Sequence, residues 1–252
     1  MEKKRILITG ATSGIGAATA RCLGLLGHPL VLCGRRQQRL EALAQELSST
    51  TQVFTLGFDI SKRQEVVAAI SSLPSAWSAI DVLINNAGNA HGLDLIHEGQ
   101  IEDWEAMIDI NIKGLLYLTR QVVPGMVARG RGHIINIGSI AGREPYPGGN
   151  VYGATKAAVD LLTQGMRMDL LDKGIKVSAI HPGLVETEFS LVRFKGDSEK
   201  ARRVYEGYQP LRPEDVADLI RYMVEAPEHV NLADVLLLPK AQAAVRMVHK
   251  TT

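Results

Sequence analysis

Short apolar runs alternate with longer stretches of mixed polarity along almost the whole chain. The short runs contain few polar residues, which is typical of strands that are buried on both faces of a parallel sheet. They predict strands at Arg5–Thr9, Leu30–Gly34, Gln52–Asp59, Val82–Asn85, Gly132–Ile137, Lys176–His181 and Asp234–Leu238. Between them, apolar residues recur at helical spacing and predict helices at Ile15–Leu26, Gln37–Leu47, Arg63–Ser71, Trp104–Ala128, Val151–Leu171 and Glu214–Glu225.

This order of elements predicts an α/β fold: a single-domain, Rossmann-type, doubly wound parallel sheet of about seven strands with helices on both faces. No linker, repeat or low-complexity segment interrupts the chain, so residues 1–252 are expected to form one dinucleotide-binding and catalytic domain. Ligands of such sheets bind outside the carboxyl ends of the strands. The residues that follow each strand are therefore the first candidates for chemistry.

Composition and charge argue against several other classes of protein. Hydrophobic residues make up 46% of the chain, and 28 basic residues nearly balance 27 acidic ones, so neither nucleic acid nor a membrane surface is indicated as a partner. No apolar stretch has the length of a membrane span, and the run Ile6–Ile8 is too short for a signal peptide. With only Cys22 and Cys33, a reduced, cytoplasmic setting is expected, and no metal site is predicted.

A glycine-rich turn follows the first predicted strand and leads directly into a helical pattern. Glycines permit positive φ and close backbone approach, and a helix start offers free N–H groups and a positive dipole end to a pyrophosphate. A turn without a ligand is the alternative, but the strand–turn–helix context favours a phosphate site. The expected cofactor contacts in this turn are Gly10, Thr12, Ser13, Gly14, Ile15 and Gly16.

Two arginines stand at the end of the second predicted strand. An NAD site commonly carries an acidic residue at this point, whereas Arg35 and Arg36 occupy it here. A guanidinium can bind a phosphate through two parallel hydrogen bonds and can stack on adenine. A solvated helix start is the alternative, although cations are mildly unfavourable at a helix N-terminus. The pair therefore predicts NADP rather than NAD.

A tyrosine and a lysine one helical turn apart form a candidate acid/base. Tyr152 and Lys156 are i and i+4 and share one helix face. A free phenol has a pKa of about 10, and a nearby ammonium would lower that pKa, giving a tunable general acid/base. Such pairs are common on solvated helix faces, but the glycine turn and Ser139, just after the fifth strand, favour catalysis. Ser139 would hold the substrate oxygen while Tyr152 exchanges the proton.

Together these motifs resemble those of the short-chain dehydrogenase/reductase family over nearly the whole chain. The matching segments are TGATSGIG at Thr9–Gly16, NNAG at Asn85–Gly88, Asn111, Ser139, YGATK at Tyr152–Lys156 and PG at Pro182-Gly183. The resemblance implies a homotetramer and a water on Asn111 that links Lys156 to solvent. It also implies that Lys156 binds the nicotinamide ribose. The contacts implied for the adenosine are Asp59, Ile60, Asn86, Ala87 and Gly88. Those implied for the nicotinamide are Pro182, Gly183, Val185 and Thr187.

A narrower resemblance points to the substrate. Trp77, Gly138–Gly149, Thr187–Asp197 and the sequence His-Val-Asn at 229–231 are similar to bacterial NADP-dependent 3-hydroxy acid dehydrogenases. That resemblance implies oxidation of serine, allo-threonine or 3-hydroxypropionate, and reduction of malonic semialdehyde. The charged pair Arg143-Glu144 departs from the pattern, since small or aromatic residues are expected there.

A carboxylate substrate needs a cationic partner, because burying an unpaired carboxylate is costly. Arg193 and Lys195 fall in the segment of about residues 187–212 that is expected to form a lid, and Arg143 is a second candidate. Ser139 and Tyr146 complete the expected substrate contacts. An ordinary surface location explains the lid cations equally well at this point.

Two other functions stay open. One is a reductase of a neutral ketone, aldehyde or sugar, which would need no carboxylate partner. The other is a catalytically silent NADP-binding sensor. Sensors of this type commonly lose the tyrosine or the lysine, and both Tyr152 and Lys156 are present here.

Overall fold

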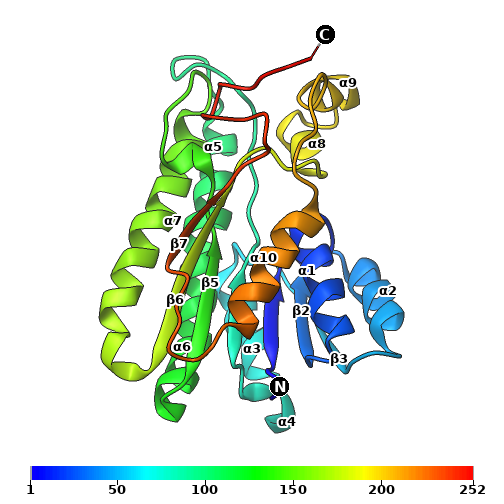
Figure 1. The fold of residues 1–252 in the computed structure, drawn as a ribbon, viewed down its shortest axis with the longest axis vertical. Helices are drawn as coiled ribbons and strands as arrows, with labels where there is room; N and C mark the ends of the chain where they lie inside the picture. Colours follow the sequence, from blue (N-terminus) through cyan, green and yellow to red (C-terminus); the bar gives the residue numbers. More distant parts are fainter. Residues whose placement is uncertain (1, 252) are drawn as a thin grey trace.

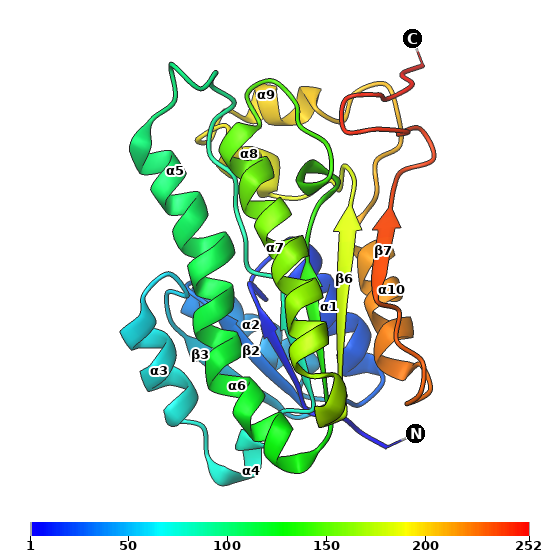
Figure 2. The same cartoon turned by 90° about the vertical axis from the view of Figure 1, so that its left-hand side faces the viewer.

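The computed structural model describes residues 2–251, which form one seven-stranded, fully parallel sheet covered by helices on both faces (Figures 1 and 2). The strands lie in the order β3-β2-β1-β4-β5-β6-β7. Their bounds are β1 (Ile6–Thr9), β2 (Leu30–Gly34), β3 (Val53–Gly57), β4 (Val82–Asn85), β5 (Gly132–Ile137), β6 (Ile175–Pro182) and β7 (Asp234–Leu237). The predicted fold class is confirmed, with strand ends that differ from the prediction by only one or two residues.

The helices divide between the two faces of the sheet. Their bounds are α1 (Gly14–Leu25), α2 (Gln37–Leu47), α3 (Arg63–Ser71), α4 (Ser75–Ser78), α5 (Ile101–Ile108), α6 (Leu115–Arg129), α7 (Asn150–Asp169), α8 (Phe189–Arg193), α9 (Ser198–Arg203) and α10 (Pro213–Glu225). Helices α1, α2 and α10 cover one face, and α3, α6 and α7 cover the other (Figure 2). Ile6 and Ile8 of β1 face the first layer and Leu7 faces the second, as the two-residue period of a strand requires.

The prediction of one continuous helix over Trp104–Ala128 is wrong. Helix α5 and helix α6 are separated by a π-helix at Asp109–Gly114. Gly114 packs closely on Ile60 there, since a Cβ would lie 3.1 Å from the Ile60 side chain. Hydrophobic periodicity cannot register an inserted π-turn, and such turns are frequent at functional sites. The turn presents Asn111, as described below.

The strand order places a cleft at the centre of the carboxyl edge. Strand β1 pairs with β2 on one side and with β4 on the other, so the order of strands reverses there. Doubly wound sheets bind ligands at such a point. Helices α8 and α9 and the C-terminal segment lie above this edge (Figure 1). No helix within residues 2–251 has both the length and the apolar character to cross a membrane.

Candidate active site

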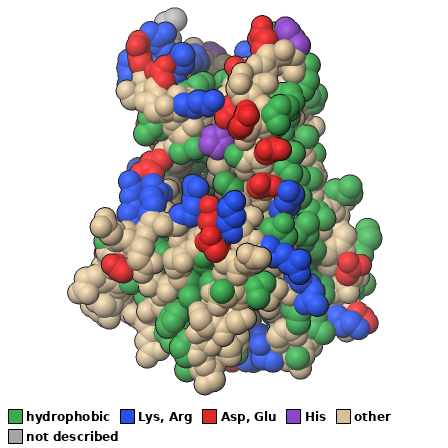
Figure 3. Space-filling view, turned by 180° about the vertical axis from the view of Figure 1, so that it is seen from behind, with side chains coloured by type: hydrophobic (Ala, Val, Ile, Leu, Met, Phe, Trp, Pro, Cys, Tyr) green, Lys and Arg blue, Asp and Glu red, His purple; other side chains and the backbone are tan. Residues whose placement is uncertain are grey.

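A cavity of about 880 Å³ opens at the carboxyl edge of the sheet. In the space-filling view it is a hollow between two lobes, with acidic and basic side chains at its mouth (Figure 3). The predicted cofactor residues that line it are Gly10, Thr12, Ser13, Gly14, Ile15, Arg35, Arg36, Asp59, Ile60, Asn86, Ala87, Gly88, Tyr152, Lys156, Pro182, Gly183, Val185 and Thr187. Ser139, Tyr146 and Arg193 line it as well.

The glycine turn owes its shape to missing side chains. Gly10 and Gly14 have positive φ values of 65° and 51°, a backbone region that other residues rarely adopt. Gly16 does not line the cavity, because it lies beneath the turn. A Cβ at Gly16 would be 2.4 Å from the carbonyl oxygen of Gly10, so only glycine lets the helix start pack this closely. The turn leaves the N-terminus of α1 facing the cavity, ready for a phosphate.

The two arginines after β2 behave differently. Arg36 donates hydrogen bonds to Thr12 Oγ1 and to Ser13 Oγ (2.7–3.0 Å), which ties its guanidinium to the glycine turn. Arg35 is more exposed and lies 3.9 Å from the carboxylate of Asp59. Both guanidiniums therefore border the space beside the phosphate turn, where a further phosphate group can be held.

Two functional neighbours of these arginines escaped the sequence analysis. Glu188 accepts from Arg36 (2.8 Å) and from Arg39 (2.8 Å), and these hydrogen bonds hold the pKa of its carboxyl below the usual range. Arg39 stands one helical turn beyond Arg36 on α2, so i, i+3 spacing was the signal available for it. Nothing in the sequence pattern indicated that Glu188 crosses the cleft to meet them.

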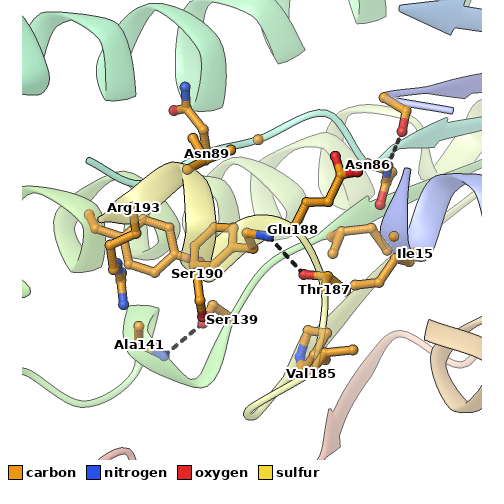
Figure 4. A pocket seen from close by; sticks show the side chains of 18 of the residues that line it. Ile15, Asn86, Asn89, Ser139, Ala141, Val185, Thr187, Glu188, Ser190 and Arg193 are labelled. Carbon is orange, nitrogen blue, oxygen red and sulfur yellow. Dashed lines mark hydrogen bonds between the residues drawn. The ribbon is translucent and has the colours of Figure 1, made fainter. Parts of the chain in front are cut away.

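The catalytic candidates converge from β5 and α7. Ser139 Oγ accepts from the backbone N–H of Ala141 (3.1 Å; Figure 4), and its hydroxyl lies beside Tyr152. Lys156 Nζ donates to the carbonyl of Ile137 (2.8 Å), and burial lowers the pKa of this lysine to about 8. Tyr152 is buried beside them.

The electrostatics of Tyr152 correct one expectation. Burial raises the pKa of this phenol to about 12, whereas the ammonium of Lys156 had been expected to lower it. The cation that opposes burial is Arg193, helped by a hydrogen bond with Ser139. The guanidinium of Arg193 stacks over the Tyr152 ring at 4.8 Å and over the Phe189 ring at 5.1 Å.

Asn111 lies behind the cavity wall rather than in it. Its side-chain amide accepts from Asn89 N–H (2.9 Å) and donates to Asn89 C=O (2.9 Å) and to Thr155 Oγ1 (3.0 Å). The π-helix brings this buried amide close to Gly88. Lys156 Nζ lies close to the same glycine. With its amide engaged in this way, the side chain fixes the loop around Gly88, and the proton-relay role of Asn111 stays a prediction.

The three cationic side chains predicted as candidates to bind the substrate have different partners in the structure. Arg193 donates to the hydroxyl of Tyr146 (3.0 Å), and its buried Nε has no partner among the described residues. Arg143 does not line the cavity, and its guanidinium pairs with Asp234 at the start of β7. Lys195 pairs with Asp103 (2.8 Å). The expectation that Arg143 contacts the substrate is therefore corrected, and Arg193 is the cation beside Tyr152.

Comparison with known proteins assigns the family. Residues 4–197 match the family model described as short chain dehydrogenase. This chain belongs to the short-chain dehydrogenase family. An NADP-dependent 3-hydroxy acid dehydrogenase of Salmonella typhi is 49% identical over 248 residues, covering 98% of this chain and 99% of the relative. A sulfoacetaldehyde reductase of Chromohalobacter salexigens is 44% identical over 239 residues, covering 94% and 95%.

The solved structures agree with this family. A closed form of serine dehydrogenase complexed with NADP+ superposes with a TM-score of 0.92, at 46% identity, covering 98% of this short-chain dehydrogenase and 99% of that chain. A structure of serine dehydrogenase from Escherichia coli gives a TM-score of 0.81 at 41% identity. The chain is thus an NADP-dependent oxidoreductase of the type that acts on a hydroxyl group.

Proposed function

We propose that this short-chain dehydrogenase transfers a hydride between NADP and the carbinol or carbonyl carbon of a small 3-hydroxy acid, such as serine, allo-threonine or the pair 3-hydroxypropionate/malonic semialdehyde. The observation that carries the proposal is the stacking of Arg193 on Tyr152 at 4.8 Å. It supplies a cation for an acid group close to the acid/base residue. Both named relatives take substrates with an acid group, a carboxylate or a sulfonate.

The residues of the cavity fit NADP. The turn at Gly10 and Gly14 lines the cavity without side chains, beside the N-terminus of α1, which suits a pyrophosphate. Arg35 and Arg36 border the place where a 2′-phosphate would lie. Bound NADP would supply the hydride acceptor or donor. The serine dehydrogenase structure is a complex with NADP+, and the Salmonella relative is NADP-dependent, which supports the same choice here.

In the oxidative direction, Tyr152 as phenolate takes the proton of the substrate hydroxyl. Ser139 gives up its hydrogen bond with Tyr152, donates to the substrate oxygen instead, and so holds that oxygen against Tyr152. Arg193 binds the carboxylate and, by its charge, lowers the pKa of the phenol against the effect of burial. Lys156, a buried cation at the cavity wall, binds the ribose hydroxyls in this proposal, which its position in the cavity lining supports. In reduction the proton moves the other way.

The test follows oxidation of NADPH with malonic semialdehyde, with sulfoacetaldehyde and with propanal as the neutral control. Malonic semialdehyde should give a much larger kcat/KM than propanal, and NADH should be a poorer donor than NADPH. Rapid reduction of propanal with little use of malonic semialdehyde would favour a neutral-carbonyl reductase. Binding of NADPH without turnover of any aldehyde would favour a sensor.

We also infer a homotetramer in the cytoplasm. The exposed apolar side chains of Leu161, Met168 and Leu171, on and just after α7, together with Leu116 and Val127 on α6, offer a surface for subunit contacts. Light scattering coupled to size exclusion measures the assembly directly, and a monomeric mass would overturn this inference without touching the catalytic proposal.

A further inference from the structure

A second cluster of chemistry-bearing side chains lies behind Ser139, outside the catalytic cavity. Asp160 from α7, His181 from β6 and Asp234 from the start of β7 bring one ligand atom each to within 4.8 Å of one another. His181 Nε2 is 3.2 Å from Asp234 Oδ1 and 3.7 Å from Asp160 Oδ1. None of the three residues lines the cavity that holds the catalytic residues.

The imidazole of His181 is the unusual member of this cluster. Its side chain is fully buried, and Nε2, the ring nitrogen that faces the two aspartates, has no well-aligned hydrogen-bond partner within residues 2–251. Buried polar atoms are almost always hydrogen-bonded, so this nitrogen needs an explanation. The Asp234 oxygen is close enough to Nε2 but lies off the N–H direction, and the Asp160 oxygen is too distant for a hydrogen bond. The ring stays in place because Gly138 has no Cβ, which would be 2.5 Å from Nδ1.

We propose that Asp160, His181 and Asp234 form a site for one borderline divalent transition-metal ion of the zinc type. One imidazole nitrogen and two carboxylate oxygens are ligands that zinc accepts. Bonds of about 2.1 Å in tetrahedral geometry separate neighbouring ligand atoms by about 3.4 Å. The two separations from Nε2, 3.2 Å and 3.7 Å, bracket that value, and the two aspartate oxygens lie within 4.8 Å of each other, so a modest shift of one carboxylate completes the geometry. The carboxylate oxygens lie to the side of the direction in which Nε2 would point its proton or its lone pair. A metal ion in that direction could bind Nε2 and both oxygens, whereas a proton on Nε2 could not be shared with them.

Arg143 would compete with the metal ion for the carboxylate of Asp234. Its guanidinium donates to Asp234 Oδ1, the same oxygen that faces His181. The arginine therefore neutralises Asp234 in the metal-free protein, and it must turn away when the ion binds. Its side chain reaches the surface, so solvent is available to it. A neighbouring cation weakens metal binding by repulsion, so removal of Arg143 should strengthen it.

The consequence of occupancy follows from the elements that the site joins. Asp160 is two turns after Tyr152 on α7, and His181 directly precedes the segment at Pro182 that lines the cavity. A bound ion would tie α7, β6 and β7 together beneath the catalytic serine. It would act by holding these elements and would not contact the substrate. Binding only to the folded chain must raise the thermal midpoint.

The experiment titrates tag-free, chelator-treated protein with Co²⁺, read by visible absorption, and with Zn²⁺, read by calorimetry and by thermal unfolding. We expect one equivalent to bind, a band of tetrahedral Co²⁺ to appear, and Mg²⁺ not to compete, since Mg²⁺ prefers oxygen ligands. Asp160→Asn, Asp234→Asn and His181→Gln should each weaken binding at least about tenfold. Asp172→Asn, at an exposed carboxylate elsewhere, is the matched control.

Arg143→Ala should tighten Co²⁺ binding by about tenfold, which a chance surface site would not do. If His181→Gln is unstable, the variants of the two partly exposed aspartates test the loss of metal binding independently. The proposal is overturned if no saturable binding occurs up to about 1 mM metal. It is equally overturned if the metal ion binds with unchanged affinity to both Asp160→Asn and Asp234→Asn.

Discussion

At the scale of single residues, the electrostatics around Tyr152 decide how the site works. Spacing along the sequence was enough to bring Tyr152, Lys156 and Ser139 together, because an i, i+4 pair and a strand end have fixed geometry. It could not say which cation acts on the phenol. That depends on α8 folding back over the cavity, where Arg193 reaches the ring and Lys156 instead meets the carbonyl of Ile137.

Tyr152→Phe should remove the acid/base while leaving the cavity intact. Turnover should fall by about 100- to 10,000-fold, the range that a positioned general acid or base contributes. Binding of NADPH, read by its fluorescence, should change little. Tyr222→Phe, at an exposed position on α10, is the control and should retain full activity. Near-normal kcat in Tyr152→Phe would mean that another group exchanges the proton.

The pH dependence of substrate oxidation should show the effect of Arg193 on the pKa of Tyr152. A positive charge beside the phenol favours the phenolate, so removing it raises the pKa of Tyr152 further above its ordinary value. In Arg193→Met, the rising limb of kcat for oxidation should therefore move to higher pH than in the wild type. A limb at the same pH in both proteins would contradict the assignment of Arg193 as the cation that tunes Tyr152.

At the scale of elements, regular periodicity was predicted well and local exceptions were not. The strands are identified by apolar runs that both faces bury, and they occur where they were expected. The π-helix at Asp109–Gly114 and the short helices α8 and α9 have no such signature. Their positions depend on contacts with distant segments, such as Gly114 on Ile60 and Lys195 on Asp103. The side chains that those elements present, Asn111 and Arg193, were therefore named but could not be oriented.

The end of β2 should select the cofactor. Replacing Arg35 and Arg36 together with alanine should weaken NADPH binding by about 2 kcal/mol, roughly thirtyfold, since hydrogen bonds to charged groups contribute this much when partly exposed. Binding of NADH should change far less. Arg63→Ala, at the exposed start of α3, serves as the control for charge loss. Equal weakening of both cofactors would show that neither arginine reads the 2′-phosphate.

At the scale of the whole molecule, the fold follows from strand–helix alternation, and its stability is linked to pH through buried histidine. Burial, with smaller contributions from Lys176 and Lys4, lowers the pKa of His133 to about 3. The imidazole is neutral in the folded protein and hydrogen-bonded to Ser178 (2.8 Å). Its contribution to stability is present above its unfolded pKa of about 6.5 and is lost as the pH falls from there toward 3.

The free energy of unfolding should accordingly decrease between about pH 6.5 and pH 3, with His133 responsible for a few kcal/mol of it. Denaturant unfolding at several pH values measures this decrease. His133→Gln should flatten the dependence, although it lowers stability near neutrality. His229→Gln, at an exposed position, should leave the slope unchanged. Equal slopes in wild type and His133→Gln would contradict the assignment.

The most direct test of the proposed function compares two substrates of the same length in two proteins. 3-Hydroxypropionate carries the carboxylate that Arg193 is proposed to bind, and 1,3-propanediol carries a neutral hydroxymethyl group in its place. The measurement is the ratio of kcat/KM for the two compounds with NADP+, in the wild type and in Arg193→Ala. The wild type should strongly prefer the acid. Arg193→Ala should reduce that ratio at least about thirtyfold, as expected for removal of one partner of a buried charge pair. An unchanged ratio, with both substrates losing rate equally, would contradict the proposal that the site recognises a 3-hydroxy acid through Arg193.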